Sequence, residues 1–338
     1  MKLGTRRERL RLRHTFRIAR GAEDVSEVVV AEVESGGIRG VGEASPSEYY
    51  GETPESVEEA LGGIADWLSD RNPEHFRHVL DDARERLGKA RAALCALDLA
   101  LLDWNGRKLG LPLHRILGLD PGRVPKTSFT IGIDSIPRMV EKLREAGDWP
   151  IIKVKLGTPE DLEIVRALRK ETAAIFRVDA NCGWTAAETI EKSRELAGLG
   201  VELIEQPLPP ERLGDMERVR RESALPVFAD ENAVVPEDVP ALAGKFHGIN
   251  IKLVKCGGIL PAIRMVHIAR TLGLRVMFGC MIESSIGCTA AAQLGPLADH
   301  MDIDGPLLIA NDPYQGLEYL KGEVRLPSGP GLGVERVS

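Results

Sequence analysis

The stretch that decides the fold is Ile151-Ile152-Lys153-Val154-Lys155-Leu156. Its alternation of apolar and cationic residues predicts a β-strand. Because successive side chains of a strand point to opposite faces, Lys153 and Lys155 would share one face, with apolar side chains on the other. Two cations buried on one face are costly unless acidic groups meet them. We therefore expect carboxylates from neighbouring strands to lie beside this one.

Similar short apolar runs recur on both sides of this strand, and helical patterns separate them. Alternation of strand and helix over eight repeats predicts a (β/α)8 barrel, an α/β fold. A doubly wound open sheet is the alternative, but it would need a glycine-rich phosphate turn after an early strand, which the sequence lacks. The strand candidates are Thr127–Ile131, Ile151–Lys155, Phe176–Asp179, Leu203–Glu205, Val227–Asp230, Ile249–Leu253, Val276–Phe278 and Met301–Asp304.

The N-terminal part of the chain has a different pattern. Val25–Glu34 and Ile38–Glu43 predict a hairpin that turns at Gly36-Gly37, and helical patterns follow as far as Leu109. We predict an α+β capping domain over residues 1–123 and the barrel over residues 124–319. The tail, residues 320–338, is rich in Gly and Pro and would pack back on the N-terminal domain.

Composition excludes several classes of protein. The 338 residues are 43% hydrophobic, enough for a large core, and the net charge of −7 argues against a nucleic-acid binder. We find neither a bilayer-spanning stretch nor a targeting signal, so no membrane partner is expected. The five cysteines are scattered, without a Cys-x-x-Cys, which favours a reduced, cytoplasmic protein. We also expect a homo-oligomer.

Three acidic residues close successive predicted strands. Asp179, Glu205 and Asp230 end the third, fourth and fifth of them. In a barrel, the C-terminal ends of the strands face a common mouth, so the three carboxylates would meet there. Their mutual repulsion is relieved by a hard divalent cation, and all-oxygen ligation favours Mg²⁺. Three unrelated surface acids at the starts of loops are the alternative interpretation.

Lysines flank this predicted metal site. Lys153 and Lys155 come from the strand before Asp179, and Lys252 comes from the strand after Asp230. A substrate carboxylate on the metal would have its α-carbon between Lys155 and Lys252. One lysine would remove the α-proton and the other would return a proton to the opposite face, which inverts the centre. Lys252 could instead be only an ion-pair partner of a carboxylate.

The charged residues lie in five short motifs: Lys153-Val154-Lys155, Asp179-Ala180-Asn181-Cys182-Gly183-Trp184, Glu205-Gln206-Pro207, Ala229-Asp230-Glu231 and Asn250-Ile251-Lys252-Leu253 followed by Gly257-Gly258. These motifs resemble those of the enolase superfamily, and the resemblance covers nearly the whole chain. The lysine on strand six is typical of its muconate-lactonizing subgroup. The resemblance implies a cap over a modified barrel whose first strand is partly antiparallel. It also implies that Asp179, Glu205 and Asp230 bind the metal and that Lys155 and Lys252 are the bases.

The subgroup contains several activities, and Asp302 and Asp304 help to choose among them. On one strand the two acids would share a face and attract a cation, such as the α-ammonium group of a dipeptide. Asp-x-Asp at this place resembles dipeptide epimerases. The resemblance thus implies an isomerase that inverts the α-carbon of a dipeptide's C-terminal residue through an enediolate. A solvated acidic turn or a helix cap is the alternative for this pair.

Four further residues are candidate substrate contacts. Arg20 lies in a segment that resembles the family's cap loop over the substrate. It would pair with a side-chain carboxylate, which favours L-Ala-D/L-Glu as the substrate and murein-peptide recycling as the context. The alternative is that Arg20 has no role in the site, because the segment is rich in arginine anyway. Cys280 and Ile282, in a segment that resembles the family's Gly-x-Met-x-Glu, would border the first residue of the dipeptide. Thr130 would contact the substrate from the end of the first strand, and a simple packing role is the alternative for it.

Two other functions remain open. An N-acylamino-acid racemase or o-succinylbenzoate synthase of the same subgroup would make little use of Asp302 and Asp304. A non-catalytic barrel that binds metal or peptide is the alternative from another class. The opposed lysines argue against it, because binding alone needs no pair of bases.

Overall fold

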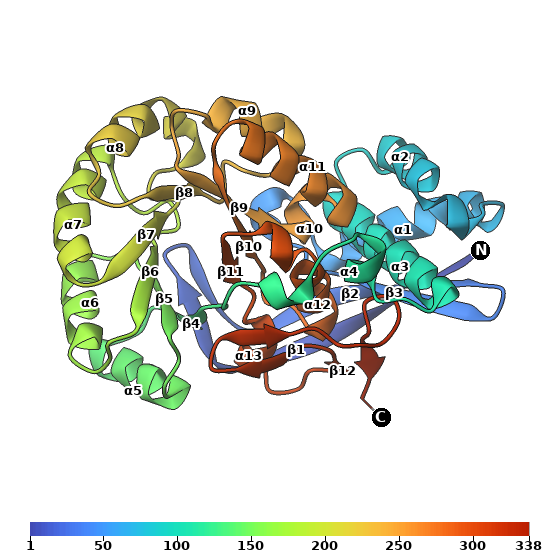
Figure 1. Cartoon of the computed structure of the whole chain (residues 1–338), viewed down its shortest axis with the longest axis horizontal. Coiled ribbons are helices and arrows are strands. Elements are labelled where there is room, and N and C mark those ends of the chain that lie inside the picture. Colours follow the sequence, from blue (N-terminus) through green and yellow to red (C-terminus); the bar gives the residue numbers. More distant parts are fainter. Residues whose placement is uncertain (338) are drawn as a thin grey trace.

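Eight parallel strands surround a common axis in the computed structural model, which describes residues 1–337 (Figure 1). They follow one another around the barrel in chain order, and a parallel bridge between Thr127 and Met301 joins the last strand to the first. The predicted barrel is therefore confirmed. The strands are β4 (Phe129–Ile131), β5 (Ile151–Lys155), β6 (Ile175–Asp179), β7 (Val201–Glu205), β8 (Val227–Ala229), β9 (Gly248–Lys252), β10 (Arg275–Gly279) and β11 (His300–Asp302).

Two details of the predicted strands are wrong. The first strand, β4, pairs with β5 in parallel throughout, and its bridge to β11 is parallel too, so no part of it is antiparallel. The last strand ends at Asp302, and Asp304 instead precedes a single helical turn, α13 (Gly305–Leu308). The reason is Pro306, whose fixed φ suits the start of a helix and whose missing N–H suits no central strand.

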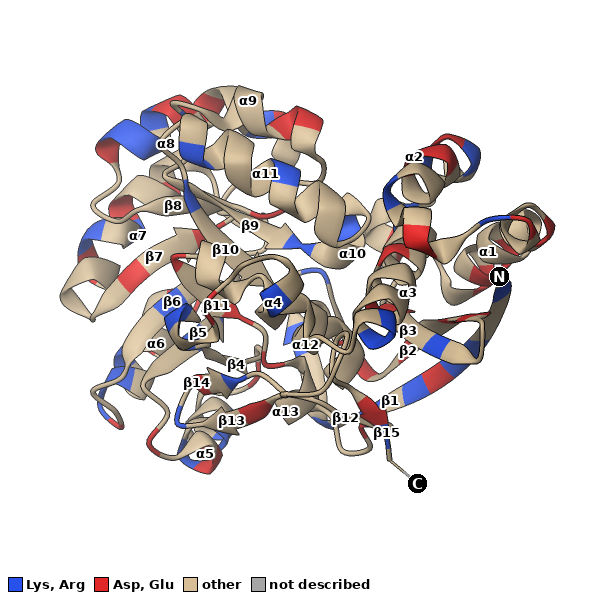
Figure 2. Cartoon of the chain, turned by 45° about the vertical axis from the view of Figure 1, so that its right-hand side comes forward, with Lys and Arg blue, Asp and Glu red and all other residues tan. Residues whose placement is uncertain are grey.

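Helices cover the outside of the barrel, and α5 to α8 form a continuous outer row in Figure 1. They are amphipathic: α6, for example, buries Ile164, Val165 and Leu168 and turns Arg166 outward. Figure 2 shows acidic and basic segments mixed along these helices, with ion pairs such as Arg218–Glu222 within one helix. The helices are α5 (Ile136–Ala146), α6 (Asp161–Arg169), α7 (Ala186–Gly198), α8 (Met216–Glu222), α9 (Val239–Leu242), α10 (Leu253–Cys256), α11 (Ile259–Thr271) and α12 (Ser285–Gln293).

The N-terminal residues form an antiparallel sheet covered by helices. The predicted hairpin is present as β2 and β3, and the longer β1 pairs with the other edge of β2. Helix α3 is buried along most of its length because it lies between this sheet and the barrel helices α10 and α11. The elements are β1 (Lys2–Ile18), β2 (Gly21–Ser35), β3 (Ile38–Ala44), α1 (Pro54–Ser69), α2 (Phe76–Leu87), α3 (Arg91–Leu109) and α4 (Leu113–Ile116).

The tip of the β1–β2 hairpin reaches the barrel. Ile133, which follows β4, donates a backbone hydrogen bond to Arg17 O (2.8 Å), and Leu12 forms a bridge with Ile309. Ala19 and Arg20, which form the turn, are thereby placed near the C-terminal ends of the barrel strands. The sheet of the N-terminal part thus contributes residues directly to the barrel mouth.

The tail contacts both parts of the chain. Its hairpin, β13 (Glu318–Leu320) and β14 (Glu323–Arg325), lies under β4, where Thr127 N donates to Gly322 O (2.8 Å). Leu332 N then donates to Asp103 of α3 (2.7 Å). The predicted domain division at residues 1–123 and 124–319, with residues 320–338 added to the first, stays a prediction, and Ser338 lies outside the described residues. No helix of the described chain has the length and apolar character needed to cross a bilayer.

Candidate active site

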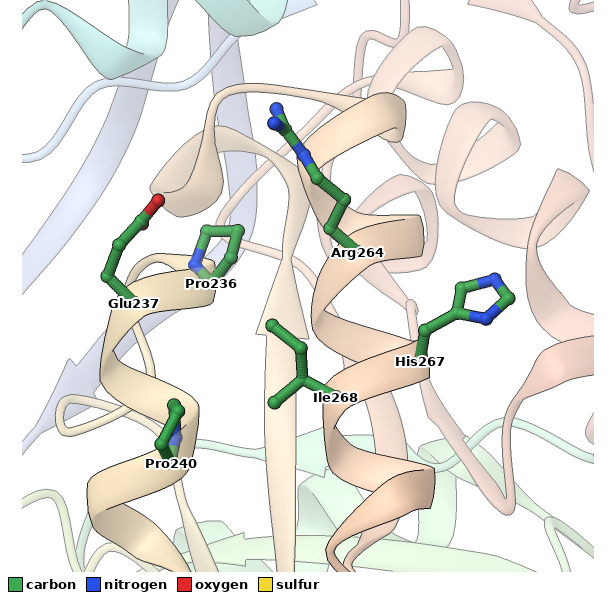
Figure 3. A pocket seen from close by; sticks show the side chains of 6 residues that line it. All are labelled: Pro236, Glu237, Pro240, Arg264, His267 and Ile268. Atoms are coloured by element: carbon green, nitrogen blue, oxygen red, sulfur yellow. The ribbon is translucent and has the colours of Figure 1, made fainter.

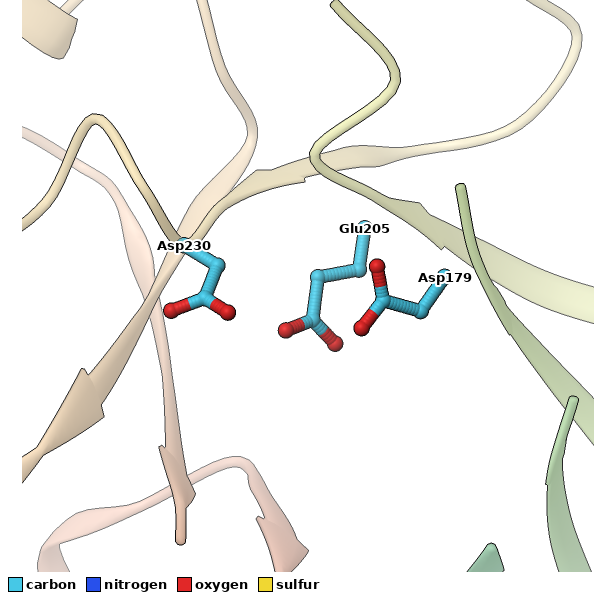
Figure 4. Close-up of side chains that lie close together, drawn as sticks. All are labelled: Asp179, Glu205 and Asp230. Atoms are coloured by element: carbon cyan, nitrogen blue, oxygen red, sulfur yellow. The ribbon is translucent and has the colours of Figure 1, made fainter. Parts of the chain in front are cut away.

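Three carboxylates meet at the C-terminal ends of neighbouring strands. Asp179 and Glu205 end β6 and β7 and are direct partners in the sheet, and Asp230 follows β8. One carboxylate oxygen of each lies within 4.8 Å of the other two, and all three side chains are buried. Figure 4 shows Glu205 between the two aspartates. This is the cluster that the sequence predicts.

The charges of this cluster are only partly compensated. Burial and the charge of Asp179 raise the pKa of Glu205 to about 7, although Lys153 opposes this shift. Burial alone would raise the pKa of Asp230, but Lys252 and Lys255 outweigh it and hold that pKa well below its ordinary value. The buried Oε2 of Glu205 has no well-aligned hydrogen bond from the described chain. A hard divalent cation fits this set of oxygen donors.

Lys155 and Lys252 lie on opposite flanks of the carboxylates. Lys155 Nζ is 2.7 Å from Asp179 Oδ2, and Lys252 Nζ is 2.9 Å from Asp230 Oδ2. Going around the barrel from β5 to β9, the charged residues therefore follow in the order Lys155, Asp179, Glu205, Asp230 and Lys252, with Asp230 directly after β8. Burial alone would lower the pKa of Lys252, but the charges of Asp230 and Glu205 outweigh it and raise that pKa.

Lys153 links the carboxylates to the last strand. Its Nζ lies 2.7 Å from Glu205 Oε2, 3.4 Å from Asp179 Oδ2 and 2.6 Å from Asp302 Oδ2. The side chain is only 2% exposed. The ammonium group of Lys153 thus lies between the cluster of three carboxylates and Asp302.

Asp302 and Asp304 have different surroundings. Asp302 forms an ion pair with Lys153 and accepts a hydrogen bond from Ser128 Oγ (2.6 Å). Burial alone would raise the pKa of Asp302, but the charge of Lys153 outweighs burial and lowers that pKa to about 2. Asp304 accepts from Thr130 N (2.6 Å) and Oγ1 (3.2 Å). Burial and the charge of Asp302 raise the pKa of Asp304 to about 7. Both acids reach the barrel mouth, although they do not share a strand.

Arg20 crosses from the hairpin tip to the same mouth. Its Nη2 lies 2.6 Å from Glu231 Oε1, and its Nη1 donates to Asn181 O (2.9 Å). The guanidinium also stacks on Tyr49, with 4.4 Å between Cζ and the ring centroid. Burial alone would lower the pKa of Arg20, but the charge of Glu231 outweighs it and raises that pKa. The structure therefore gives Arg20 an internal carboxylate partner.

The remaining candidates follow β10. Ile282 is buried in a small apolar cluster with Leu10, Val28 and Ile309, and its carbonyl accepts from Ser45 Oγ (2.9 Å). Cys280 is partly exposed. The roles predicted for these two residues, like those of the other candidate site residues, stay predictions.

Two family models match this chain. Residues 2–118 match the N-terminal domain of mandelate racemase and muconate lactonizing enzyme, and residues 136–336 match the enolase C-terminal domain-like model. The chain belongs to the enolase superfamily. Enolase-superfamily relatives from Maribacter sp. and Flavobacterium johnsoniae are 43% and 44% identical over 99% of both chains, and each is named L-Ala-D/L-amino acid epimerase.

A solved enolase-superfamily structure has nearly the same shape. It is a dipeptide epimerase from Methylococcus capsulatus complexed with Mg and the dipeptide L-Arg-D-Lys. Its sequence is 35% identical, the match covers 99% of both chains, and the TM-score is 0.91.

Sequence reasoning did not identify every residue that builds this enolase-superfamily site. Lys255 is buried, and its Nζ donates to Asp230 O (2.6 Å), Asp230 Oδ1 (2.5 Å) and Asn250 O (3.2 Å). Asn250 Nδ2 donates to Glu205 Oε1 (2.7 Å). Asn250 could have been predicted to face the site, because it lies two residues before Lys252 and therefore on the same face of the strand.

A separate hollow of about 460 Å³ lies on the outside of the barrel. Figure 3 shows its lining on two neighbouring helical segments. It contains no group of candidate metal ligands within the described residues, and we assign it no part in the site. The lining residues are Pro236, Glu237, Pro240, Arg264, His267 and Ile268.

Proposed function

We propose that this chain is a Mg²⁺-dependent dipeptide epimerase. It inverts the α-carbon of the C-terminal residue of L-Ala-D/L-Glu or a related dipeptide. The observation that carries the proposal is the position of Lys155 and Lys252 at the two ends of one row of carboxylates. The names of the relatives from Maribacter and Flavobacterium support the same substrate class.

Asp179, Glu205 and Asp230 would hold the Mg²⁺. The bound ion supplies positive charge for the substrate carboxylate and for the negative charge that develops on it. Two observations on Glu205 support this assignment: its Oε2 has no well-aligned hydrogen bond, and its pKa is raised although Lys153 lies 2.7 Å away. Both indicate negative charge that the chain itself does not fully compensate. Mg complexes are also known among the structural neighbours.

The two lysines would carry the proton in opposite directions. The neutral amine of one takes the α-proton, and the electron pair of the broken C–H bond moves toward the carboxylate to give an enediolate. The ammonium group of the other lysine then protonates the opposite face, so one proton leaves, one arrives and the configuration inverts. Lys153 would add positive charge beside this region.

The other candidates would position the dipeptide. Asp302 and Asp304 would receive its α-ammonium group, and within the described chain no cation lies at ion-pair distance from Asp304. Thr130 holds Asp304 in place. Arg20 would lie against the side chain of the C-terminal residue, and Cys280 and Ile282 would border the first residue.

Exchange of the α-proton tests this function. L-Ala-L-Glu and other L,L-dipeptides are incubated with the enzyme and Mg²⁺ in D₂O, and deuterium uptake is measured by mass spectrometry. We expect uptake with inversion, and loss of epimerisation in Lys155→Ala and in Lys252→Ala. Full activity in either variant would exclude the two-base scheme.

A second candidate is an N-acylamino-acid racemase, because Asp302 already has Lys153 as its cation and is less available to an ammonium group. N-acetylated amino acids in the same assay distinguish the two activities. A homo-oligomeric state and a cytoplasmic location belong to the same proposal. The five cysteines, which form no disulfide, support a reducing compartment, and sedimentation velocity tests the oligomer.

A further inference from the structure

The guanidinium group of Arg20 is held from several sides. It forms an ion pair with Glu231 at 2.6 Å, donates to Asn181 O at 2.9 Å and lies over the Tyr49 ring. Its Nη1 is also 3.4 Å from Cys182 Sγ. These partners come from the loops after β6 and β8 and from the N-terminal part of the chain. Arg20 is therefore fixed beside the carboxylate cluster rather than extended into solvent.

The negative charge of the Glu231 carboxylate is compensated by Arg20. The Glu231 side chain is 1% exposed, and neither carboxylate oxygen has a well-aligned hydrogen bond from the described residues. Arg20 is also the one cation at ion-pair distance from it in the part of the chain that the structure describes. Separation of the two would leave a buried anion next to Asp230, which is strongly unfavourable. The pair should persist when substrate enters.

We propose that Glu231 sets the charge selectivity of the epimerase by neutralising Arg20, so that the enzyme favours an uncharged C-terminal side chain over an acidic one of the same shape. This inference rests on the proposed function. Glu231 is a positioning residue in this scheme, because it acts through Arg20.

The net charge of the Arg20–Glu231 pair explains why we expect a preference for uncharged side chains. A free arginine selects a carboxylate through a charge-assisted, often bidentate pair. The Arg20–Glu231 pair has no net charge, so an acidic side chain gains little attraction there. It also adds negative charge to a mouth that already contains five carboxylates, those of Asp179, Glu205, Asp230, Asp302 and Asp304. An uncharged side chain loses nothing, since the Arg20–Tyr49 stack still offers it a flat contact surface.

The matched substrates L-Ala-L-Gln and L-Ala-L-Glu differ in charge and hardly in shape. For the Mg²⁺-loaded wild type we expect kcat/KM for the glutamine dipeptide to equal or exceed that for the glutamate dipeptide. Glu231→Gln leaves Arg20 uncompensated and should shift this ratio toward glutamate by roughly tenfold, mainly through KM. Glu231→Asp keeps the charge and should leave the ratio within about twofold of the wild type.

Further variants separate this inference from a general loss of structure. Arg20→Gln combined with Glu231→Gln should show no gain for glutamate, because the cation is gone. Calorimetric Mg²⁺ binding checks that Asp230, the neighbour of Glu231, is undisturbed.

An unchanged ratio in a folded Glu231→Gln variant would overturn the inference, as would a wild-type preference for the glutamate dipeptide over the glutamine dipeptide. If no dipeptide is turned over, the proposed function fails. The ratio of the two dipeptides' dissociation constants for the wild type, measured by calorimetry, then still tests the charge selectivity. That ratio needs no variant, so it also serves if Glu231→Gln does not fold.

Discussion

Glu43 and Glu283 place two buried carboxyl groups against the same glycine, where the N-terminal sheet meets the barrel. A Cβ added to Gly287 would lie 2.4 Å from Glu283 Oε2 and 3.1 Å from Glu43 Oε1. Ser284 N donates to Glu43 Oε1 (2.9 Å). Burial and the charge of Glu283 raise the pKa of Glu43 to about 8, and burial raises the pKa of Glu283 to about 7.

Stability should therefore fall at alkaline pH. Both groups bind a proton more tightly in the folded state, so their contribution is complete below their ordinary pKa and is lost as pH rises through about 7 to 8. Lys252 faces Glu283, but Asp312 adds negative charge near Glu43. We expect Glu43→Gln to unfold at a higher temperature than the wild type at pH 9, by about 2 °C.

The measurement is thermal unfolding from pH 6 to pH 9. Glu85→Gln, which changes an exposed carboxylate on α2, is the control and should follow the wild-type curve. Parallel curves for Glu43→Gln and the wild type would show that this pair does not titrate in the range.

Lys153→Met should bind Mg²⁺ more tightly. The Lys153 ammonium group lies within 3.4 Å of Asp179 and within 2.7 Å of Glu205, so it competes with a metal ion for the same oxygens. Its removal should lower the Mg²⁺ dissociation constant by roughly tenfold and enlarge the rise in unfolding temperature on Mg²⁺ addition. Calorimetry measures the first effect. Lys126→Met, an exposed change, is the control, and equal affinity in all three proteins would contradict the prediction.

Asp304→Asn should weaken dipeptide binding through the ammonium group. Because Asp304 has no cation partner in the described chain, we expect KM for L-Ala-L-Glu to rise by roughly tenfold, with little change for an N-acetylated analogue. Asp302→Asn should instead lower thermal stability, because Lys153 loses one of its three carboxylate partners, the one at 2.6 Å. Steady-state kinetics with both substrates measures the first effect. An equal rise of KM for both substrates would assign Asp304 a merely structural role.

Gly258→Ala should destabilise the contact between α3 and α11. Gly258 has a φ of 116°, and a Cβ there would lie 2.4 Å from Asp98 Cγ. Asp98 accepts from Ile259 N (2.7 Å) at the start of α11, so the clash would disturb this contact as well. Gly273→Ala is the matched control: its φ is also positive, at 72°, but nothing lies within 4 Å of its Cβ position. Urea unfolding should show the larger loss for Gly258→Ala, and equal losses would refute the steric argument.

The sequence allowed the barrel and the row of charged residues to be predicted for a simple reason. Strands of a parallel barrel follow chain order, and side chains alternate along each strand, so Lys155, Asp179 and Lys252 could be ordered from local patterns alone. The end of β11 was harder to predict. Asp302 and Asp304 look like alternating strand residues, but the strand ends at Asp302 and a helical turn that contains Pro306 begins directly after Asp304.

Contacts between distant segments could not be predicted in this way. The Arg20–Glu231 pair joins a hairpin turn to a loop after β8, and neither segment carries a pattern that indicates the other. The burial of Lys255 likewise depends on three acceptors, two of them backbone carbonyls, which no periodicity reveals.

The β1–β2 turn also bears on how such enzymes diversify. The groups proposed to move the proton stand on barrel strands, whereas Arg20 reaches the mouth from a two-residue loop of another sheet. Mutations in that loop can change which substrate side chain the enzyme accepts, while the residues that carry out the reaction stay the same. New specificities could thus arise in few evolutionary steps.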